Sequence, residues 1–269
     1  MTVPAETLVQ QPALQAHQPP EDASSDRRAD LDAKQAQVAA LLQENACEGL
    51  LALEPENFSW LSSGAMPRGN LDPAESPVVY YSAEQRWLIA GNVDSQRFFD
   101  EEVEGLGFQL KEWPWHWGRE QLLQDLCNGR KFVSDRPLAQ ATHVAEQLRS
   151  LRRTLTAYEQ ACLIALGQIL AHALEAACRT MMPGETEREV AAQVSHRLMH
   201  RGVHPVQIGV AADGRSRLYR QCGFTSTPIQ KNAVVTATAR KYGLNATASR
   251  TVSFGPPDAT LRQEHNTVC

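Results

Sequence analysis

The sequence predicts two domains: an α/β domain over residues 31–147 and an α+β domain over residues 148–269, in which a helix pair covers an antiparallel sheet. Three observations carry this prediction. Short apolar runs of strand length alternate with helical patterns up to about residue 147. Two capping-box motifs then open two apolar helices. Beyond about residue 206 the apolar residues alternate with polar ones, as they do in half-buried strands.

The elements of the first domain follow from the spacing of its apolar residues. Val38, Leu41 and Leu42 recur at helical spacing and predict a helix from about residue 30 to residue 48. The run Leu50–Leu53 then predicts a buried strand. Further strands are expected at 77–81, 86–90, 108–110 and 132–133, and further helices at 95–103 and 119–126.

Two helices and a hairpin make up the predicted second domain. The capping box Thr156–Glu159 opens a long apolar helix, and Thr186–Glu189 opens another that ends at Gly202. Strands follow at 206–212, 232–240 and 244–254, with a turn at 241–243 between the last two. In the last strand apolar and polar residues alternate, so we expect one face of the sheet to be buried under the helices.

The composition narrows the class of protein. Lys and Arg number 26 against 31 Asp and Glu, and a net charge of −5 argues against a nucleic-acid partner. The sequence shows no unbroken apolar run of membrane-spanning length and no signal-peptide pattern, so we expect a cytoplasmic protein without a membrane partner. Residues 1–30 are rich in Gln, Pro, Ala and acidic residues, which predicts a disordered tail.

The order of these elements resembles a known family. A helix, a Pro-Gly-Glu-Thr motif at 183–186, a second helix and a hairpin ending in Arg250–Gly255 resemble the "pita-bread" family of creatinase, prolidase and Xaa-Pro aminopeptidase. Asn57–Gly64 resembles the N-x-x-Y-L-S-G segment of that family's N-terminal domain. The resemblance covers about residues 34–269. It implies a creatinase-like N-terminal domain, a pita-bread domain and an aminopeptidase-like hydrolase.

The metal ligands of this family are replaced in the sequence. Active members carry two aspartates on the hairpin strands, which with a later His and two Glu hold two divalent metals. Counting back from Arg250, these positions are Thr236 and Thr247, and we expect the two to lie opposite each other across the hairpin. Because a neutral hydroxyl cannot replace a carboxylate on such a metal pair, we expect no metal cofactor and a pseudoenzyme.

Two further departures weaken the expected chemistry. Where the family carries a substrate-facing histidine, this sequence has Gln221, whose amide cannot transfer a proton. The sequence printed here ends at Cys269 within a helix-like segment, so we also expect a partial pita-bread domain without the later His and Glu ligands. Its uncovered apolar surface would favour a homo-oligomer.

Six residues are the candidates for a substrate pocket, although no residue is assigned a catalytic role. They are Tyr219, Arg220, Gln221, Thr236, Thr247 and Arg250. The cluster Arg215, Arg217 and Arg220 suits a carboxylate, but a solvated loop is at least as good an interpretation. Thr236 and Thr247 can equally be a simple pair of strand-favouring residues.

Two other clusters are interpreted as structural. His196 and His200 are spaced i, i+4, but no Glu follows the first of them as in a zinc-protease helix, so we expect a solvated helix face. The aromatic run Trp113–Trp117 is expected to fill the edge of a core or an interface rather than to bind a ring.

Three functions stay open. The chain can be an aminopeptidase-like metallopeptidase, a metal-free hydrolase in the manner of creatinase, or a non-catalytic binding or regulatory relative. Its ligand would be a small peptide or another small molecule. The family resemblance favours the first, whereas the chemistry of the residues favours the third.

Overall fold

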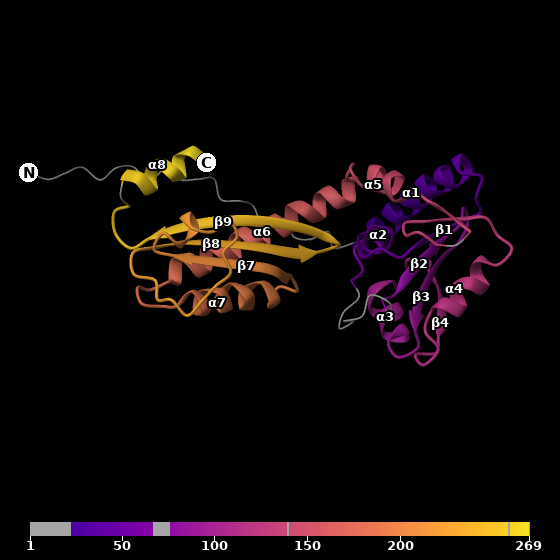
Figure 1. Ribbon diagram of the computed structural model, residues 1–269, viewed down its shortest axis with the longest axis horizontal. Coiled ribbons are helices and arrows are strands. Elements are labelled where there is room, and N and C mark those ends of the chain that lie inside the picture. Colours follow the sequence, from indigo (N-terminus) through magenta and orange to yellow (C-terminus); the bar gives the residue numbers. More distant parts are fainter. Residues whose placement is uncertain (1–22, 67–75, 139, 258, 269) are drawn as a thin grey trace, which may run out of the picture.

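The computed structural model describes residues 23–66, 76–138, 140–257 and 259–268, which fold into two bodies that meet end to end (Figure 1). The first body runs from α1 (Ala23–Glu44) to α5 (Ala145–Leu151), and the second runs from α6 (Ala157–Thr180) to α8 (Ala259–Val268). The chain passes from one to the other between α5 and α6. The predicted class, an α/β part followed by helices on an antiparallel sheet, is confirmed.

A mixed six-stranded sheet forms the centre of the first body, in the order β4-β3-β2-β1-β5-β6. The strands are β1 (Gly49–Ala52), β2 (Val78–Tyr81), β3 (Arg86–Gly91), β4 (Gln109–Trp113), β5 (Phe132–Ser134) and β6 (Ala141–His143). β6 is absent from the prediction because its Ala-Thr-His sequence is short and carries no apolar alternation. It pairs in parallel with β5 at the edge of the sheet.

Helices cover both faces of this sheet. Besides α1 and α5 they are α2 (Pro55–Leu61), α3 (Ser95–Glu102) and α4 (Glu120–Cys127). One apolar core gathers α1, α2, α3 and α5 around residues such as Phe58 and Phe98. A second core lies on the other face, where α4 packs near Trp87, Trp113 and Phe132. The central strands β1, β2, β3 and β5 are therefore buried from both sides, as their near-continuous apolar runs predict.

The predicted tail contains the start of α1. Residues 1–22 lie outside the described residues, but residues 23–30 are helical, so the prediction is wrong for them. The reason is tertiary: the Arg27 guanidinium donates to the backbone oxygens of Ser62, Ser63 and Glu102. These hydrogen bonds reach residues far along the chain, so no local pattern could reveal them.

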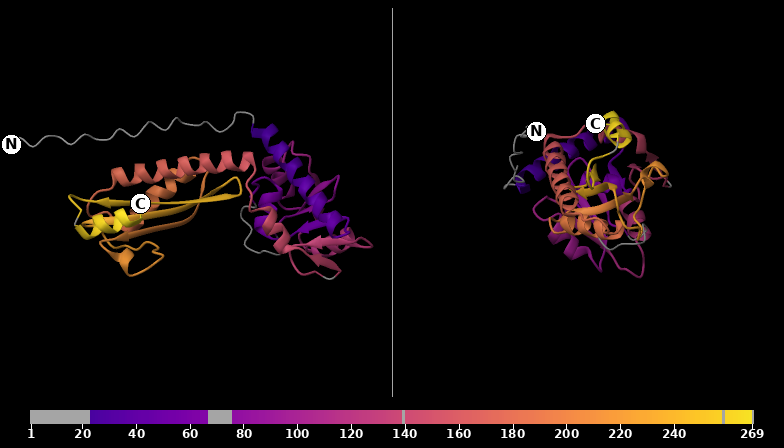
Figure 2. Two further views of the ribbon diagram at one scale, coloured as in Figure 1. Left: turned by 90° about the horizontal axis from the view of Figure 1, so that it is seen from above. Right: turned by 90° about the vertical axis from the view of Figure 1, so that its left-hand side faces the viewer.

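The second body is a three-stranded antiparallel sheet under two helices. Its elements are α6, α7 (Glu187–Met199), β7 (His204–Ala212), β8 (Asn232–Lys241) and β9 (Leu244–Ser253), with strand order β7-β8-β9. Both predicted capping boxes are present, at Thr156 and Thr186. α6 lies along the apolar face of β8 and β9 (Figure 2). By length and composition alone α6 could cross a membrane. In this fold one side of the helix packs in the apolar core of the second body.

The turn of the β8–β9 hairpin sets the register of both strands. Tyr242 and Gly243, with φ of 57° and 72°, form a two-residue turn, and Lys241 pairs with Leu244. Positive φ at both central residues matches the right-handed twist of the strands. The predicted turn at 241–243 is one residue too long, and a pairing of Thr236 with Thr247 would require a turn centred between Lys241 and Tyr242, one residue earlier than the observed centre. Every cross-strand pair therefore differs from the expected one.

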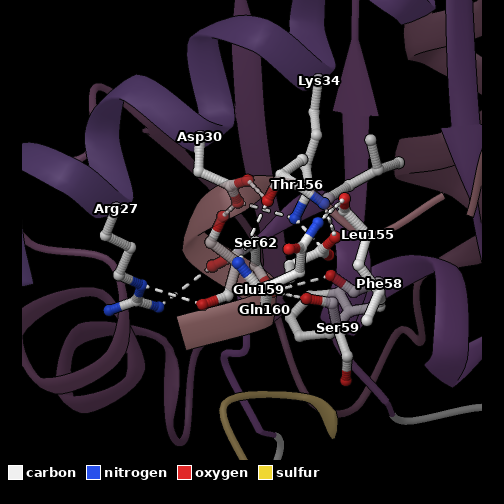
Figure 3. A network of polar contacts seen from close by, with 12 residues as sticks. Arg27, Asp30, Lys34, Phe58, Ser59, Ser62, Leu155, Thr156, Glu159 and Gln160 are labelled. Carbon is white, nitrogen blue, oxygen red and sulfur yellow. Dashed lines mark hydrogen bonds and ion pairs between the residues drawn. The ribbon is translucent and has the colours of Figure 1, made fainter. Parts of the chain in front are cut away.

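A buried group of charges joins the two bodies. The Lys34 Nζ atom of α1 lies 2.7 Å from Asp30 Oδ2 and 2.8 Å from Glu159 Oε1 of α6. Asp30 also accepts hydrogen bonds from the Ser63 hydroxyl and, at 2.6 Å, from the Thr156 hydroxyl. Figure 3 shows Asp30, Lys34, Thr156 and Glu159 pointing toward one another. All the oxygens of Asp30 thus have partners, which a buried carboxylate requires.

The tip of the β8–β9 hairpin makes a second contact between the bodies. The Arg240 guanidinium donates to the Ser59 hydroxyl of α2 at 2.9 Å. The backbone of Gly243 packs so closely on Gly64 that an added Cβ would lie 3.0 Å from the Gly64 Cα atom. The hairpin and the start of α6 therefore both rest on α1 and the end of α2.

We predict that Lys34→Ala destabilises the protein by about 3 kcal/mol, because it leaves Asp30 and Glu159 as buried charges without their cation. Arg149→Ala removes a cation from an exposed ion pair with Glu146 and should change the stability by less than about 0.5 kcal/mol. Urea unfolding of both variants checks this. Equal stability of the two variants would show that the buried group contributes little.

Candidate functional site

A hollow of about 350 Å³ lies on the polar face of the three-stranded sheet. Its floor is formed by side chains of β7, β8 and β9, and its wall is formed by residues 216–222. The wall belongs to the connection between β7 and β8, which folds back over the sheet. The lining is largely neutral and polar: Gln207, Gln221, Thr236, Thr238 and Thr247 line it together with Tyr219, Arg220 and Cys222.

The structure brings five of the six predicted pocket residues together. Tyr219, Arg220 and Gln221 lie in the wall, and Thr236 and Thr247 lie in the floor. Arg250 does not belong to this group. It shares the apolar face of β9 with Ala246 and Ala248, and its guanidinium lies 3.0 Å from the Glu175 carboxylate of α6. The prediction for Arg250 is wrong because period-two alternation places it on the face opposite Thr247.

Thr236 and Thr247 lie on one face of the sheet, but the prediction that they lie opposite each other is wrong. Thr236 pairs with Ser249, and Thr247 pairs with Thr238. Their hydroxyls form hydrogen bonds across the strands, 2.7 Å from Thr236 to Ser249 and 2.8 Å from Thr238 to Thr247. The floor is thus a ladder of paired hydroxyls, and Thr236 and Thr247 are diagonal neighbours in it.

This donor set does not fit a pair of divalent metals. Such a pair needs anionic ligands, and the described residues that line the hollow include neither a carboxylate nor an imidazole. The hydroxyls of Thr236 and Thr247 already have partners. Within the described ranges, no group of three His, Cys, Asp or Glu side chains is placed to hold a metal ion.

Sequence reasoning missed the residue that holds the wall in place. Glu187 lies at the start of α7 with its side chain fully buried. Its carboxylate accepts hydrogen bonds from the Ala212 N–H at the end of β7, from the Arg215 Nε atom, and from the N–H and hydroxyl of Thr225. The only signal in the sequence was its place in the capping box, where the neighbouring Glu189 makes the cap.

The hydrogen bonds to Glu187 govern its ionisation. Burial by itself would raise the pKa of the Glu187 carboxyl, but the hydrogen bonds from Ala212, Thr225 and Arg215 outweigh burial and hold the pKa below its ordinary value. The residue is therefore an anion at neutral pH. It acts as a fixed acceptor that joins α7, β7 and the wall.

The three arginines of the predicted basic cluster have different roles. Arg215 pairs with Glu187 at 2.8 Å and donates to the backbone oxygens of Val210 and Gly223, so it is structural. Arg217 pairs with Glu264 of α8 at 3.1 Å. Arg220 is exposed and lines the hollow. Among these three, Arg220 is the cation available to a ligand.

A glycine in β7 lets the wall approach the floor. The Val210 N–H donates to the Gly223 backbone oxygen at 3.0 Å, so the wall runs directly beside β7. A Cβ atom on Gly209 would lie 2.2 Å from the Cys222 backbone oxygen. A glycine inside a strand marks this kind of close backbone approach.

The two remaining clusters do not form a site with these residues. The rings of His196 and His200 stack on the exposed side of α7 with centroids 6.2 Å apart, and with His172 of α6 they line a small cavity of about 130 Å³. Trp113 is buried in the core, whereas Trp115 and Trp117 are 65% and 70% exposed. The expectation that the aromatic run fills a core edge therefore holds for Trp113 alone.

The chain is similar to several known proteins in sequence or structure. Residues 161–269 match the model of metallopeptidase family M24. An X-Pro aminopeptidase from Thermotoga maritima has a similar structure, with a TM-score of 0.70 and 18% identity over 87% of this chain and 68% of that chain. A prolidase from Pyrococcus horikoshii gives a TM-score of 0.70 and 18% identity over 88% and 69% of the two chains.

A more distant relative is the X-prolyl aminopeptidase of Caenorhabditis elegans, described as a cytosolic enzyme with a di-nuclear active site. Its TM-score is 0.59 at 12% identity, over 89% of this chain and 43% of that chain. No curated protein matches the sequence. At such low identities the structural likeness shows a common fold and no more.

We predict that Gly209→Ala displaces the wall and lowers the stability by about 2 kcal/mol, because the new methyl group would overlap the Cys222 backbone oxygen. Gly223→Ala is the matched control, since its Cβ would meet no atom within 4 Å. Thermal unfolding of the two variants compares them. If Gly209→Ala is as stable as Gly223→Ala, the wall does not pack on β7 as described.

We predict a pH-dependent cost for Glu187→Gln. Since the folded-state pKa lies below that of the unfolded chain, about 4.3, ionised Glu187 stabilises the fold above that pH. The contribution is lost as the pH falls through the folded-state pKa. The variant should be less stable than the parent by about 2 kcal/mol at pH 7, and the difference should shrink at pH 3. Glu104→Gln, an exposed carboxyl, is the control; a pH-independent difference for Glu187→Gln would contradict the assignment.

Proposed function

We propose that this chain, whose residues 161–269 belong to metallopeptidase family M24, binds a short peptide or another small polar molecule in the hollow without metal-dependent hydrolysis. The observation that carries the proposal is the floor of paired hydroxyls. Thr236 and Thr247 are hydrogen-bonded to Ser249 and Thr238, so the floor presents neutral groups in place of metal-binding carboxylates.

The lining suits recognition by hydrogen bonds. Gln207 and Gln221 each offer an amide donor and an amide acceptor, which match the N–H and C=O groups of a peptide. The Arg220 guanidinium can form two parallel hydrogen bonds with a terminal carboxylate. Tyr219 adds an aromatic surface to the same wall. A dipeptide with a free carboxyl end combines these features and is the ligand we expect.

Hydrolysis without metals is less well supported by the lining. A creatinase-like reaction needs a group that takes and returns a proton near neutral pH. At the position of the family histidine the hollow has Gln221, and its described lining contains no other imidazole and no carboxylate. We therefore favour binding over either form of hydrolysis.

Isothermal calorimetry with a Gly-Pro dipeptide, followed by analysis for free glycine and proline, tests the proposal. We expect saturable binding, no cleavage with or without added manganese, and no stoichiometric manganese after dialysis. Arg220→Gln should weaken binding by about tenfold, because a charge-assisted hydrogen bond is lost. Arg179→Gln, an exposed arginine of α6, should bind as the parent does. Cleavage of the dipeptide, or two retained metals per chain, would contradict the proposal.

The double variant Thr236→Asp, Thr247→Asp asks whether two side chains alone separate this hollow from a metallopeptidase. We expect no cleavage, because a working metal pair needs ligands and supporting groups from several elements. The stability should fall by about 1 kcal/mol, since two cross-strand hydroxyl pairs are lost and Asp is a poor strand former. Manganese-dependent stabilisation together with cleavage would overturn this account of the site.

A further inference from the structure

A second cavity, of about 260 Å³, lies where the two bodies meet. It is lined by Ser59 and Trp60 of α2, by Arg152 at the end of α5, by Tyr158 of α6, and by Arg240 at the tip of the hairpin. It shares no lining residue with the hollow described above. We propose that this cavity binds a small oxyanion, a carboxylate or phosphate compound, between Arg152 and Arg240.

Unused hydrogen-bond donors gather around the cavity. The Nε atoms of Arg152 and Arg240 and the Nε1 atom of Trp60 are buried and have no hydrogen-bond partner in the described part of the chain. Trp60 as a whole is only 7% exposed. A buried donor without an acceptor is costly, and native proteins rarely leave several together. A ligand with several oxygen acceptors in the cavity would bring acceptors next to these side chains.

The charges at the cavity also favour an anion. Glu159 is already occupied, because its carboxylate pairs with Lys34 and accepts the Thr156 N–H. Arg240, in contrast, donates only to the neutral Ser59 hydroxyl among its described side-chain contacts. Arg152 lies 4.0 Å from the half-exposed Glu56 carboxylate, a long and weak ion pair. Arg240 therefore has no described ionic partner, Arg152 has only the weak pair with Glu56, and the Glu159 carboxylate is already paired.

Two more ionisable groups in the lining stay neutral, while Lys34 and Glu56 contribute one charge of each sign to it. Burial raises the pKa of the Tyr158 hydroxyl and of the Cys162 thiol, so neither carries a negative charge at pH 7 that would compete with a ligand. The cavity volume is slightly below the range of about 300–1,000 Å³ that holds drug-sized ligands. The occupant is therefore a small molecule and not a peptide segment.

Such a ligand would act on the arrangement of the two bodies. Arg240 belongs to the second body, Trp60 belongs to the first, and Arg152 lies in the connection between them. An oxyanion held by all three adds a bridge beside the buried pair of Lys34 and Glu159. Since it binds the folded junction and not the unfolded chain, it should raise the unfolding temperature as its concentration rises.

Nuclear magnetic resonance of the full chain tests the proposal with two probes, inorganic phosphate and succinate, titrated at constant ionic strength. We expect the indole N–H signal of Trp60 and the Nε–H signals of Arg152 and Arg240 to shift in a saturable way with at least one probe. Whichever probe gives the tighter binding identifies the source of the oxyanion. Arg152→Gln and Arg240→Gln should each weaken that binding by about tenfold.

Arg153→Gln is the matched control, because Arg153 neighbours Arg152 but is exposed and does not line the cavity. It should bind the probe as the parent does. If Arg240→Gln fails to fold, Arg152→Gln and its control decide the question alone. The proposal is overturned if neither probe gives a saturable shift at Trp60, or if Arg153→Gln weakens binding as much as Arg152→Gln. Neither result depends on dipeptide binding in the hollow, so the two proposals fail separately.

Discussion

The buried pair of Lys34 and Glu159 is the constraint on which the arrangement of the two bodies depends. Glu159 caps the first turn of α6 by accepting the Thr156 N–H, and its other contact is to Lys34 of α1. Asp30 then binds Lys34, Thr156 and Ser63 together. One set of charges thus fixes where α6 begins, and the sheet follows because α6 covers the apolar face of β8 and β9.

The junction cavity follows from that placement. The hairpin reaches α2 because β8 and β9 run along α6, and the junction cavity is the space that remains between the hairpin tip, α2 and the connection. Glu187 holds the wall of the hollow in place, and Glu159 in the same way holds the start of α6 at the junction. In both places the oxygens of a buried carboxylate accept hydrogen bonds or an ion pair from neighbouring groups. These carboxylates stabilise architecture and leave the floor of the hollow neutral.

The sequence allowed the elements and faces of the second body to be predicted, because capping boxes and alternation are local patterns. Five of the six candidate residues therefore lie together in the hollow, whereas the same alternation places Arg250 on the opposite face of the sheet. The register of the hairpin was wrong, since moving the centre of the turn by one residue changes every partner by two residues, and local propensity does not fix where the turn at Lys-Tyr-Gly is centred. The start of α1 and the roles of Glu187 and Lys34 depend on partners distant in sequence, which no local pattern reveals.

The central claim is that the floor of the hollow holds a ligand and not a metal pair. A crystal soaked with manganese and a Gly-Pro dipeptide, with diffraction measured at a wavelength that gives manganese an anomalous signal, tests it most directly. We predict no anomalous peak between Thr236 and Thr247, and dipeptide density whose carboxylate meets Arg220. Two anomalous peaks about 3.5–4 Å apart on the floor, the spacing of two-metal hydrolases, would contradict the account.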